Sequence, residues 1–453
     1  MHRSGVLFLT VSTITPAASV FVIGSDVIAQ AGSGAILAFL LGAIICVPLA
    51  FAYGELSSAF PFTGAEYTFL GRILGPPWGF MVLGLNIVGG ALTQGVTALG
   101  LAAYLGVVIP GVPTLGAALA AVGLSTLTAI LNIRTNALVT GLFLATELAA
   151  LGAMSALGLA HPHRSALHAL IHPSLIGALG APAPASLAVI GLATAGAVYA
   201  YNGFGAAVSF GEELHDARRK VASVILWSLV IGGLTEALPI TAVIVGAPDL
   251  GKVLSAASPA SAFIATGGAF FAKAVSLGVA AAIVNAMIVT GLSNARQLYA
   301  TGRDQVWAPT VNRAFCATHP RFRSPWIATL ATGGLAAAAC LLGLRLLVIF
   351  TATSIVVTYA GVCVSVLVGR RTGATAHGQY RTPWFPWSPI LALIALAAMI
   401  AADLADPAVG RVSLAATVAV MAVFAGYYWL FTRRRGAWRL RGADGELLGG
   451  PAP

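Results

Sequence analysis

Two apolar stretches of the chain are interrupted by residues that could bind a small charged molecule through the peptide backbone. Residues 13–19 place Pro16 among three hydroxyl side chains. Proline removes a backbone donor and clashes with the preceding turn, so a helix through this segment must kink or break. Residues 199–205 place Asn202 and two glycines in a second apolar stretch. Unwound backbone exposes N–H and C=O groups, which can hold the charged groups of a ligand.

Other sequence patterns that could indicate a metal, nucleotide or catalytic site are weak. His161, His163, His168 and His172 lie close together in the sequence. Metal binding requires converging imidazoles, so we expect a solvated loop or a short surface helix there. Residues 32–34 (Gly-Ser-Gly) lack the preceding strand of a nucleotide-binding loop. No Walker, Ser/His/Asp or HExxH arrangement stands out, so we expect no metal, no cofactor and no enzymatic activity.

The elements that must position the two breaks are membrane-spanning helices. Apolar residues make up 58% of the 453 residues and charged residues only 8%, which is too little polar surface for a soluble protein. Apolar stretches of about 20 residues, the length that crosses a bilayer, recur along the chain. We therefore expect an all-α polytopic membrane protein with about twelve spans. The expected spans are residues 7–30, 35–59, 76–106, 113–132, 137–160, 186–211, 219–246, 268–302, 326–343, 346–369, 387–404 and 410–432.

Basic residues predict the orientation of these spans. If the N-terminus is cytoplasmic, 19 of the 24 lysines and arginines fall on the cytoplasmic side, including Arg134 and the arginines from Arg433 onward. Positive charge is enriched in cytoplasmic loops, so both termini are expected in the cytoplasm and the chain in the cytoplasmic (inner) membrane. The basic residues are scattered over several loops. We therefore expect contact with the lipid bilayer and no binding of nucleic acid.

The two breaks lie five expected spans apart, at corresponding places in two halves of the chain. Such a pair is typical of a transporter site built on inverted repeats. One alternative is that Pro16 only kinks its helix and the glycines only permit close packing. Another is a membrane sensor that binds a ligand without transporting it. A channel should instead show a continuous polar pore face, and none is visible.

Three segments of the chain carry a resemblance to a known family. The first runs from TPAASVFVIGSDVIAQAG to FAYGELSSAFPFTGAEYTFLGRILGP and contains Glu55, Phe60, Pro61, Gly64 and Tyr67. The second is YAYNGFGAAVSFGEELHDARRKV at the sixth expected span, and the third is SNARQLYATGRDQVWAP at the eighth. In this order they resemble the amino acid–polyamine–organocation superfamily of secondary transporters, over about residues 5–435.

The resemblance implies a LeuT-like 5+5 inverted repeat, with discontinuous spans 1 and 6 and two further helices at the C-terminus. The first repeat would occupy residues 1–160 and the second residues 186–369, separated by an external loop at 161–185. The last two spans would lie within residues 370–432, followed by a cytoplasmic tail at 433–453. A secondary active transporter of this kind moves its substrate by alternating access around a central site.

By the same resemblance, the first break would bind a substrate carboxylate. The family's glycine-serine-glycine loop falls on Ala17, Ala18 and Ser19, whose N–H groups would begin a half-helix. Carbonyls of the second break would accept the substrate ammonium, and Phe204 matches the position of an aromatic lid. The predicted substrate-binding residues are Thr15, Ala17, Ala18, Ser19, Tyr199, Tyr201, Asn202, Gly203, Phe204 and Gly205.

The residue after Phe204 bears on the identity of the substrate. Many members that carry polyamines or basic substrates have Asp or Glu at this point, whereas this chain has Gly205. The glycine favours a neutral, zwitterionic amino acid. The Thr-Pro form of the first break resembles putrescine importers instead, so a polyamine or amine importer is the alternative. An acidic side chain in the central cavity beside Phe204 would discriminate between the two.

Glu147 is predicted to couple transport to an ion. It lies in the fifth expected span, in the sequence FLATELAAL, where some proton-coupled members carry a lysine. Ionisable residues inside the membrane are rare and mark function by default. The resemblance implies that Glu147 carries a transported proton or replaces a coupling cation, in symport or exchange, with H⁺ favoured over Na⁺. The alternative is a structural carboxyl that pairs with a helix break or a hydroxyl.

Overall fold

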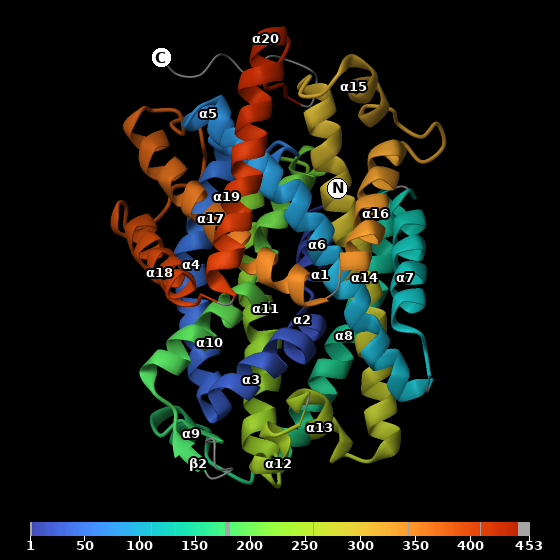
Figure 1. Cartoon of the computed structure of the whole chain (residues 1–453), viewed down its shortest axis with the longest axis vertical. Helices are drawn as coiled ribbons and strands as arrows, with labels where there is room; N and C mark the ends of the chain where they lie inside the picture. Colours follow the sequence, from blue (N-terminus) through green and yellow to red (C-terminus); the bar gives the residue numbers. More distant parts are fainter. Residues whose placement is uncertain are drawn as a thin grey trace.

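The computed structural model consists almost entirely of helices. It describes residues 2–109, 111–131, 133–176, 182–256, 258–342, 344–407 and 409–442. Most long helices run along the long axis of the molecule (Figure 1). The long helices are α1 (Arg3–Ile14), α4 (Ala35–Ala59), α6 (Pro76–Val108), α7 (Thr114–Ala129), α8 (Ile133–Ala160), α10 (Leu187–Ala200), α11 (Ala217–Gly246), α14 (Ala269–Arg303), α16 (Trp326–Ala339), α17 (Leu344–Arg371), α18 (Trp387–Ala405) and α19 (Gly410–Tyr427).

Short elements connect or extend these helices. The short α-helices are α2 (Pro16–Ala18), α3 (Ser25–Ala31), α5 (Ala65–Ile73), α9 (Ala166–Ile171), α12 (Leu250–Leu254), α13 (Pro259–Ala265), α15 (Pro309–Phe315) and α20 (Arg433–Arg435). The π-helical segments are η1 (Ser19–Gly24) and η5 (Tyr428–Thr432), and the 3-10 segments are η2 (Gly32–Gly34), η3 (Phe204–Glu213) and η4 (Cys340–Leu342). The strands are β1 (Ser174–Ile176) and β2 (Pro182–Pro184), which pair in antiparallel fashion.

Every expected membrane span coincides with a helical segment. Within the described residues, nine helical stretches are long and apolar enough to cross a membrane. The first of them, Arg3–Ala59, contains the first two expected spans. The fourth and ninth expected spans coincide with the shorter apolar helices Thr114–Ala129 and Trp326–Leu342. The prediction of an all-α polytopic membrane protein is confirmed.

The segment 161–185, expected as a loop, contains α9 and the β1–β2 hairpin. The backbone N–H of Ser174 donates to Ser33 Oγ at 2.8 Å, so the hairpin packs on the turn between α3 and α4. Gly32 is required in this turn, because its φ is 59° and a Cβ there would lie 2.1 Å from the carbonyl oxygen of Ser174. Residues 177–181 lie outside the described part of the chain.

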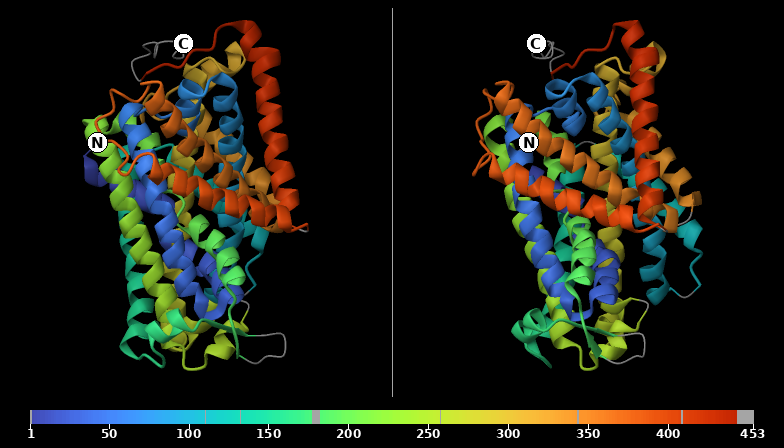
Figure 2. Two further views of the ribbon diagram at one scale, coloured as in Figure 1. Left: turned by 90° about the vertical axis from the view of Figure 1, so that its left-hand side faces the viewer. Right: turned by 60° about the vertical axis from the view of Figure 1, so that its left-hand side comes forward.

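The interior is built around α1, α11 and α14. Helix α11 packs along α4 and α8, α14 packs against α6 and α8, and α1 contacts α8, α11 and α14. Helices α18 and α19 pack on α17 and lie at the periphery, as the two views of Figure 2 show. The helix breaks that follow α1 and α10 therefore lie inside the bundle and away from its lipid-facing surface.

Glu55 ties the end of α4 to the end of α17. Its fully buried carboxylate lies 2.8 Å from Arg370 Nη2 and accepts the backbone N–H of Thr382 at 2.8 Å and the hydroxyl of Thr375 at 3.1 Å. The Arg370 guanidinium also lies over the ring of Phe385, 4.4 Å from its centroid. A buried ion pair with this many hydrogen bonds fixes the relative position of the two helices.

Helices α5, α15 and α20 lie at one end of the molecule, here called the arginine-rich end, and α9, α12 and α13 lie at the opposite end (Figure 1). The arginine-rich end carries Arg72, Arg313 and Arg433–Arg435. These residues belong to the set predicted to face the cytoplasm. The side chain of Arg134, which belongs to the same set, and residues 443–453 lie outside the described part.

Residues 436–442, here called the C-terminal strap, fold back onto the arginine-rich end. Trp438 Nε1 donates to Tyr67 Oη at 2.7 Å, and the backbone N–H of Arg441 donates to Asp304 Oδ1 at 3.0 Å. Leu440 is buried in a cluster that includes Tyr67 and Phe80. The strap thus connects α5, α6 and the end of α14.

Candidate substrate site at two helix breaks

The first span breaks at Thr15. Helix α1 ends at Ile14, Thr15 adopts a left-handed conformation with φ of 56°, and Pro16 begins α2. A β-branched residue rarely adopts this conformation, whereas proline suits a first helical turn because it lacks an N–H. The backbone N–H of Ala17 donates to Glu147 Oε1 at 2.7 Å. A carboxylate of the protein itself therefore lies at the first turn of the half-helix, where negative charge is favoured.

The sixth span breaks beside the first. Helix α10 ends at Ala200, and Gly203, with φ of 119°, turns the chain into η3. A Cβ at Gly203 would lie 2.7 Å from both the carbonyl oxygen of Thr13 and the backbone nitrogen of Ile14, so only glycine fits. Ser19 Oγ lies 3.1 Å from the carbonyl oxygen of Ala200. The two breaks are therefore in direct contact.

Two cavities meet at the breaks. The large cavity, of about 760 Å³, extends toward α3, where Asp26 and Gln30 line it. The polar cavity, of about 170 Å³, lies on the side of α5, where Glu66 lines it. The residues that line both cavities are Thr13, Thr93, Asn202, Thr290 and Ile355. The broken backbone thus lies at the boundary between two compartments.

An aromatic cluster forms one wall at this boundary. Tyr53 and Tyr359 line the polar cavity, with ring centroids 5.8 Å apart. Phe204 packs behind both rings, with centroid distances of 5.7 Å to Tyr53 and 5.9 Å to Tyr359. Tyr359 Oη donates to Asn202 Oδ1 at 2.6 Å. This hydrogen bond fixes the Asn202 side chain where the two cavities meet.

An acidic side chain enters the polar cavity from α5. Glu66 accepts hydrogen bonds from Tyr53 Oη at 2.8 Å and from Asn86 Nδ2 at 3.1 Å. Burial raises the pKa of the Glu66 carboxyl above its ordinary value, and its hydrogen bonds partly oppose this rise. Tyr53 belongs to the aromatic cluster and packs on Phe204, so the Glu66 carboxyl is hydrogen-bonded to the cluster itself.

Ion pairs join η3 to its neighbours on the arginine-rich side of the polar cavity. Arg303 donates two hydrogen bonds to Glu212, at 2.9 and 3.0 Å, and the N–H and hydroxyl of Thr63 donate to the same carboxylate at 3.0 Å each. Arg296 Nε donates to Glu213 at 3.0 Å. The side chains of Arg303 and Glu212 are only 11% and 12% exposed, so the pair is largely shielded from water.

The comparison with known families covers nearly the entire chain. The sequence model of the family described as amino acid permease matches residues 3–427. The chain belongs to the amino acid permease family. A permease is a membrane transporter, so the prediction of a transporter rather than an enzyme is confirmed. The resemblance to the amino acid–polyamine–organocation superfamily is confirmed as well.

Curated relatives of the permease are also transporters. An uncharacterized transporter of Mycobacterium tuberculosis is 26% identical over 341 residues, which cover 73% of this chain and 71% of the relative. A transporter of Mycobacterium bovis shows the same identity and coverage. The low-affinity putrescine importer PlaP of Escherichia coli is 24% identical over 309 residues, which cover 66% of this chain and 65% of that protein.

Most of the predicted substrate-binding residues line a cavity of the permease. Those that do so are Thr15, Ala18, Ser19, Tyr199, Asn202, Gly203 and Gly205. Ala17, Tyr201 and Phe204 are buried and do not appear among the described residues that line either cavity. Tyr201 Oη instead donates to the carbonyl oxygen of Phe39 at 3.1 Å. Glu147 lies behind the first break, bonded to Ala17.

Sequence reasoning did not assign Tyr53, Glu66 and Tyr359 to the candidate site, although all three line the polar cavity. Glu66 stands in the segment GAEYTFLG, where the family resemblance rests on Gly64 and Tyr67. The one available signal was an acidic residue next to the apolar end of the second expected span. The two tyrosines lie in otherwise apolar spans, where nothing in the sequence sets them apart from packing residues.

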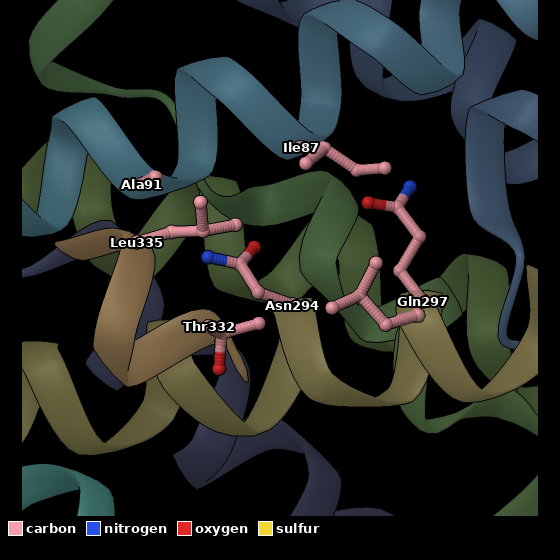
Figure 3. A pocket seen from close by; sticks show the side chains of 7 residues that line it. Ile87, Ala91, Asn294, Gln297, Thr332 and Leu335 are labelled. Atoms are coloured by element: carbon pink, nitrogen blue, oxygen red, sulfur yellow. The ribbon is translucent and has the colours of Figure 1, made fainter. Parts of the chain in front are cut away.

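A third, much smaller cavity lies between α6, α14 and α16 of the permease (Figure 3). Asn294 and Gln297 extend into it from α14, and both also line the polar cavity. Its volume of about 10 Å³ is close to the minimum for one water molecule, so it is too small for a substrate.

Proposed function

We propose that this permease is a secondary transporter of an organic amine. The observation that carries the proposal is the sign of the charges in the site. Among the described residues that line the two cavities, every charged side chain is acidic: Glu66 in the polar cavity, and Asp26 and Asp403 in the large one. A cationic substrate would find charge partners in such a site, whereas a substrate carboxylate would meet only like charge.

The first break supports the same substrate class. A zwitterionic amino acid needs a donor for its carboxylate, and the half-helix N–H groups were the expected donors. The N–H of Ala17 already donates to Glu147. An amine has no carboxylate to place there, so this hydrogen bond can persist while the amine is bound.

Glu66 supplies the acid that residue 205 does not. A Cβ at Gly205 would lie 2.7 Å from Tyr53 Cε1, so the aromatic cluster leaves no room for an acidic side chain at that position. The hydroxyl of the same tyrosine donates to Glu66. We infer that the substrate ammonium is held between Glu66 and the ring faces, by charge pairing and cation–π attraction.

One relative, the low-affinity putrescine importer PlaP, supports an amine substrate by its name, whereas the mycobacterial relatives are uncharacterized transporters. In our proposal, residues 1–160 and 186–369 form the two inverted repeats and rock against each other around the breaks. Glu147 carries the coupled proton. The arginine-rich end faces the cytoplasm, with the chain in the inner membrane.

The test is uptake of labelled putrescine into vesicles that contain the purified permease, with and without an inward proton gradient. Diamines and monoamines should compete, whereas neutral amino acids should compete weakly. Competition by neutral amino acids that disappears when their carboxylate is amidated would overturn the proposal in favour of a zwitterionic substrate. Asp249→Asn is the control for surface charge, because this exposed residue caps α12 and faces Arg164, away from the described lining of both cavities, and asparagine caps equally well.

A further inference from the structure

Glu236 is a buried carboxyl in the middle of α11. Its side chain is 0% exposed, and neither of its carboxylate oxygens is hydrogen-bonded within the described part of the chain. An ionised carboxylate in this state would be strongly unfavourable, because water has been removed and no partner replaces it. The group must therefore be neutral or hold a cation.

The neighbouring turns of α11 show what Glu236 faces. One turn earlier, a Cβ at Gly232 would lie 2.9 Å from Ile14 Cδ1. One turn later, Ile240 Cδ1 would lie 2.5 Å from a Cβ at Gly24. Residues four apart share a helix face. Glu236 therefore faces the broken backbone of the first span, midway between Ile14 and Gly24.

Among the described residues, the groups that interact with Glu236 provide no positive charge. The hydroxyl of Ser19 faces it from η1, and the titratable groups that interact with it are Glu147 on α8, Cys46 on α4 and Tyr201 at the end of α10. Ser19 Oγ also lies 3.1 Å from the carbonyl oxygens at both breaks, those of residues 14 and 200. Glu236 thus adjoins the hydroxyl that joins the two broken helices.

Glu147, on the neighbouring helix α8, shows the same shortage of donors at the first break. Among the described residues, Glu147 Oε2 has no hydrogen-bond partner, and the carboxyl faces Asn285. The amide nitrogen of Asn285 donates to Ser12 Oγ at 3.1 Å, and no donor within the described part of the chain reaches Asn285 Oδ1. A proton on Glu147 Oε2 would supply the donor that the two facing acceptors lack.

We infer that Glu236 is a second proton-binding carboxyl, which acts together with Glu147 from a neighbouring helix that also contacts the first break. Each group gains one proton to become a neutral carboxylic acid and releases it to return to a carboxylate. The protonated Glu236 can donate to Ser19, whereas its carboxylate would repel the carbonyl oxygens that Ser19 bridges. The occupancy of the pair therefore biases the geometry of both breaks. This inference rests on the proposed proton coupling at Glu147 and extends it to a second site.

Infrared spectroscopy of the permease in lipid tests the protonation directly and without any substrate. Neutral carboxylic acids absorb at an infrared frequency different from that of carboxylates, and their absorption band shifts when heavy water replaces water. Glu236→Gln should fold like the wild type, because glutamine resembles the neutral acid in shape, and its difference spectrum at neutral pH should show the loss of one carboxylic acid. Glu236→Asp should move this band without removing it. Asp249→Asn, which changes an exposed carboxyl, should leave the band unchanged.

Three results would overturn the inference. One is a carboxylic-acid band that is unchanged in Glu236→Gln, because Glu236 would then be ionised. Another is loss of the band in the wild type when sodium replaces potassium at constant ionic strength, which would indicate a metal cation at this position. The third is proton-driven accumulation that remains at the wild-type level in Glu236→Gln, where we expect a loss of about tenfold or more with exchange retained. A different substrate would overturn the proposed function but leave the infrared result intact.

Discussion

The carboxylate of Glu147 accepts the backbone N–H of Ala17 at 2.7 Å, across 130 positions of sequence. The donor belongs to the first turn after the break in the first span, which is the turn where an anionic ligand would otherwise bind. A titratable side chain therefore controls the electrostatics of that turn, and its protonation weakens the hydrogen bond that it accepts.

We expect Glu147→Gln to separate exchange from proton coupling. The glutamine oxygen can still accept the Ala17 N–H, so the fold and substrate exchange should persist. Accumulation driven by a proton gradient should fall by about tenfold or more, since glutamine cannot carry a proton. Vesicle uptake with and without a pH gradient measures both. The matched control is Thr146→Val, which changes an exposed hydroxyl one residue away that bonds only to its own helix. Coupling at the wild-type level in Glu147→Gln would exclude this residue as the proton carrier.

Glu66 should make substrate affinity depend on pH. Burial raises the pKa of its carboxyl above the ordinary value, so acidification neutralises it sooner than an exposed glutamate. The KM for an amine should rise as the pH falls through this range. Glu66→Gln should raise the KM by about tenfold at neutral pH and abolish that pH dependence, because roughly one charge interaction is lost.

Tyr53→Phe is the companion variant for Glu66. It removes the hydrogen bond to Glu66 and keeps both the charge and the ring. The charge that the substrate ammonium meets is retained, so the KM should rise by less than the roughly tenfold expected for Glu66→Gln while its pH dependence remains. Equal KM values in Glu66→Gln and the wild type would show that the Glu66 carboxyl takes no part in substrate binding.

Arg303 should hold the arginine-rich end closed. Arg303→Met leaves Glu212 buried without its cation, and breaking a buried pair in this way costs about 3–5 kcal/mol. We expect a lower melting temperature and faster alkylation of Ser209→Cys, a position that lines the polar cavity, in a background without the native cysteines. The double exchange Glu212→Arg with Arg303→Glu should restore part of the protection. Unchanged alkylation in Arg303→Met would show that this pair does not control access.

Asp304 should make the stability of the permease fall as the pH rises. Burial raises the pKa of the Asp304 carboxyl to about 7, although Arg303 and the N–H of Arg441 oppose the shift. The unfolded-state pKa is about 3.9, so the folded protein binds more protons between these values and loses stability as the pH rises from about 4 to 7. Asp304→Asn should flatten the dependence of melting temperature on pH in this window. A slope identical to the wild type would contradict the assignment.

The C-terminal strap should stabilise the arginine-rich end. Leu440 is 7% exposed and packs with Tyr67 and Phe80, so Leu440→Ala should lower the free energy of unfolding by about 2–5 kcal/mol. Trp438→Phe, which replaces the indole by a smaller aromatic ring and removes the donor to Tyr67, should cost at least about 1 kcal/mol. Thermal unfolding in detergent measures both. Two variants as stable as the wild type would mean that the strap adds little to the fold.

The helices and the two breaks could be predicted because their signals are local. Twenty apolar residues in a row define a span, and Pro16 or Gly203 interrupts a helix whatever surrounds it. The contact between the breaks follows from the fold and could be expected only through the family resemblance. The sequence was a poorer guide to which side chains line the candidate site. Glu66 lies at the polar cavity because of how α5 is placed relative to the second span. Its hydrogen-bond donor Asn86 lies 20 positions away in the sequence. No periodic pattern encodes such a contact.

The contacts of the acidic residues could not be predicted from the sequence for the same reason. Glu147 was visible as an acid in an apolar span, but its bond to Ala17 depends on how α8 crosses the first break. Gly205 was interpreted as the loss of an acid from the site. In the structure it is the space that Tyr53 requires, and the acid comes from another helix. The residue type at position 205 alone cannot predict an acidic side chain at position 66, because the two residues are distant in the sequence.

The strap also has a consequence for how the protein is made. Tyr67 and Phe80 precede Leu440, the residue that covers them, by 373 and 360 positions, so they are synthesised long before it. The apolar surface at this end therefore stays uncovered while the intervening helices enter the bilayer, and it is sealed only once Leu440 has been added to the chain. Reporter proteins fused after residue 442 would leave this closure intact, whereas fusion at residue 435 would remove it.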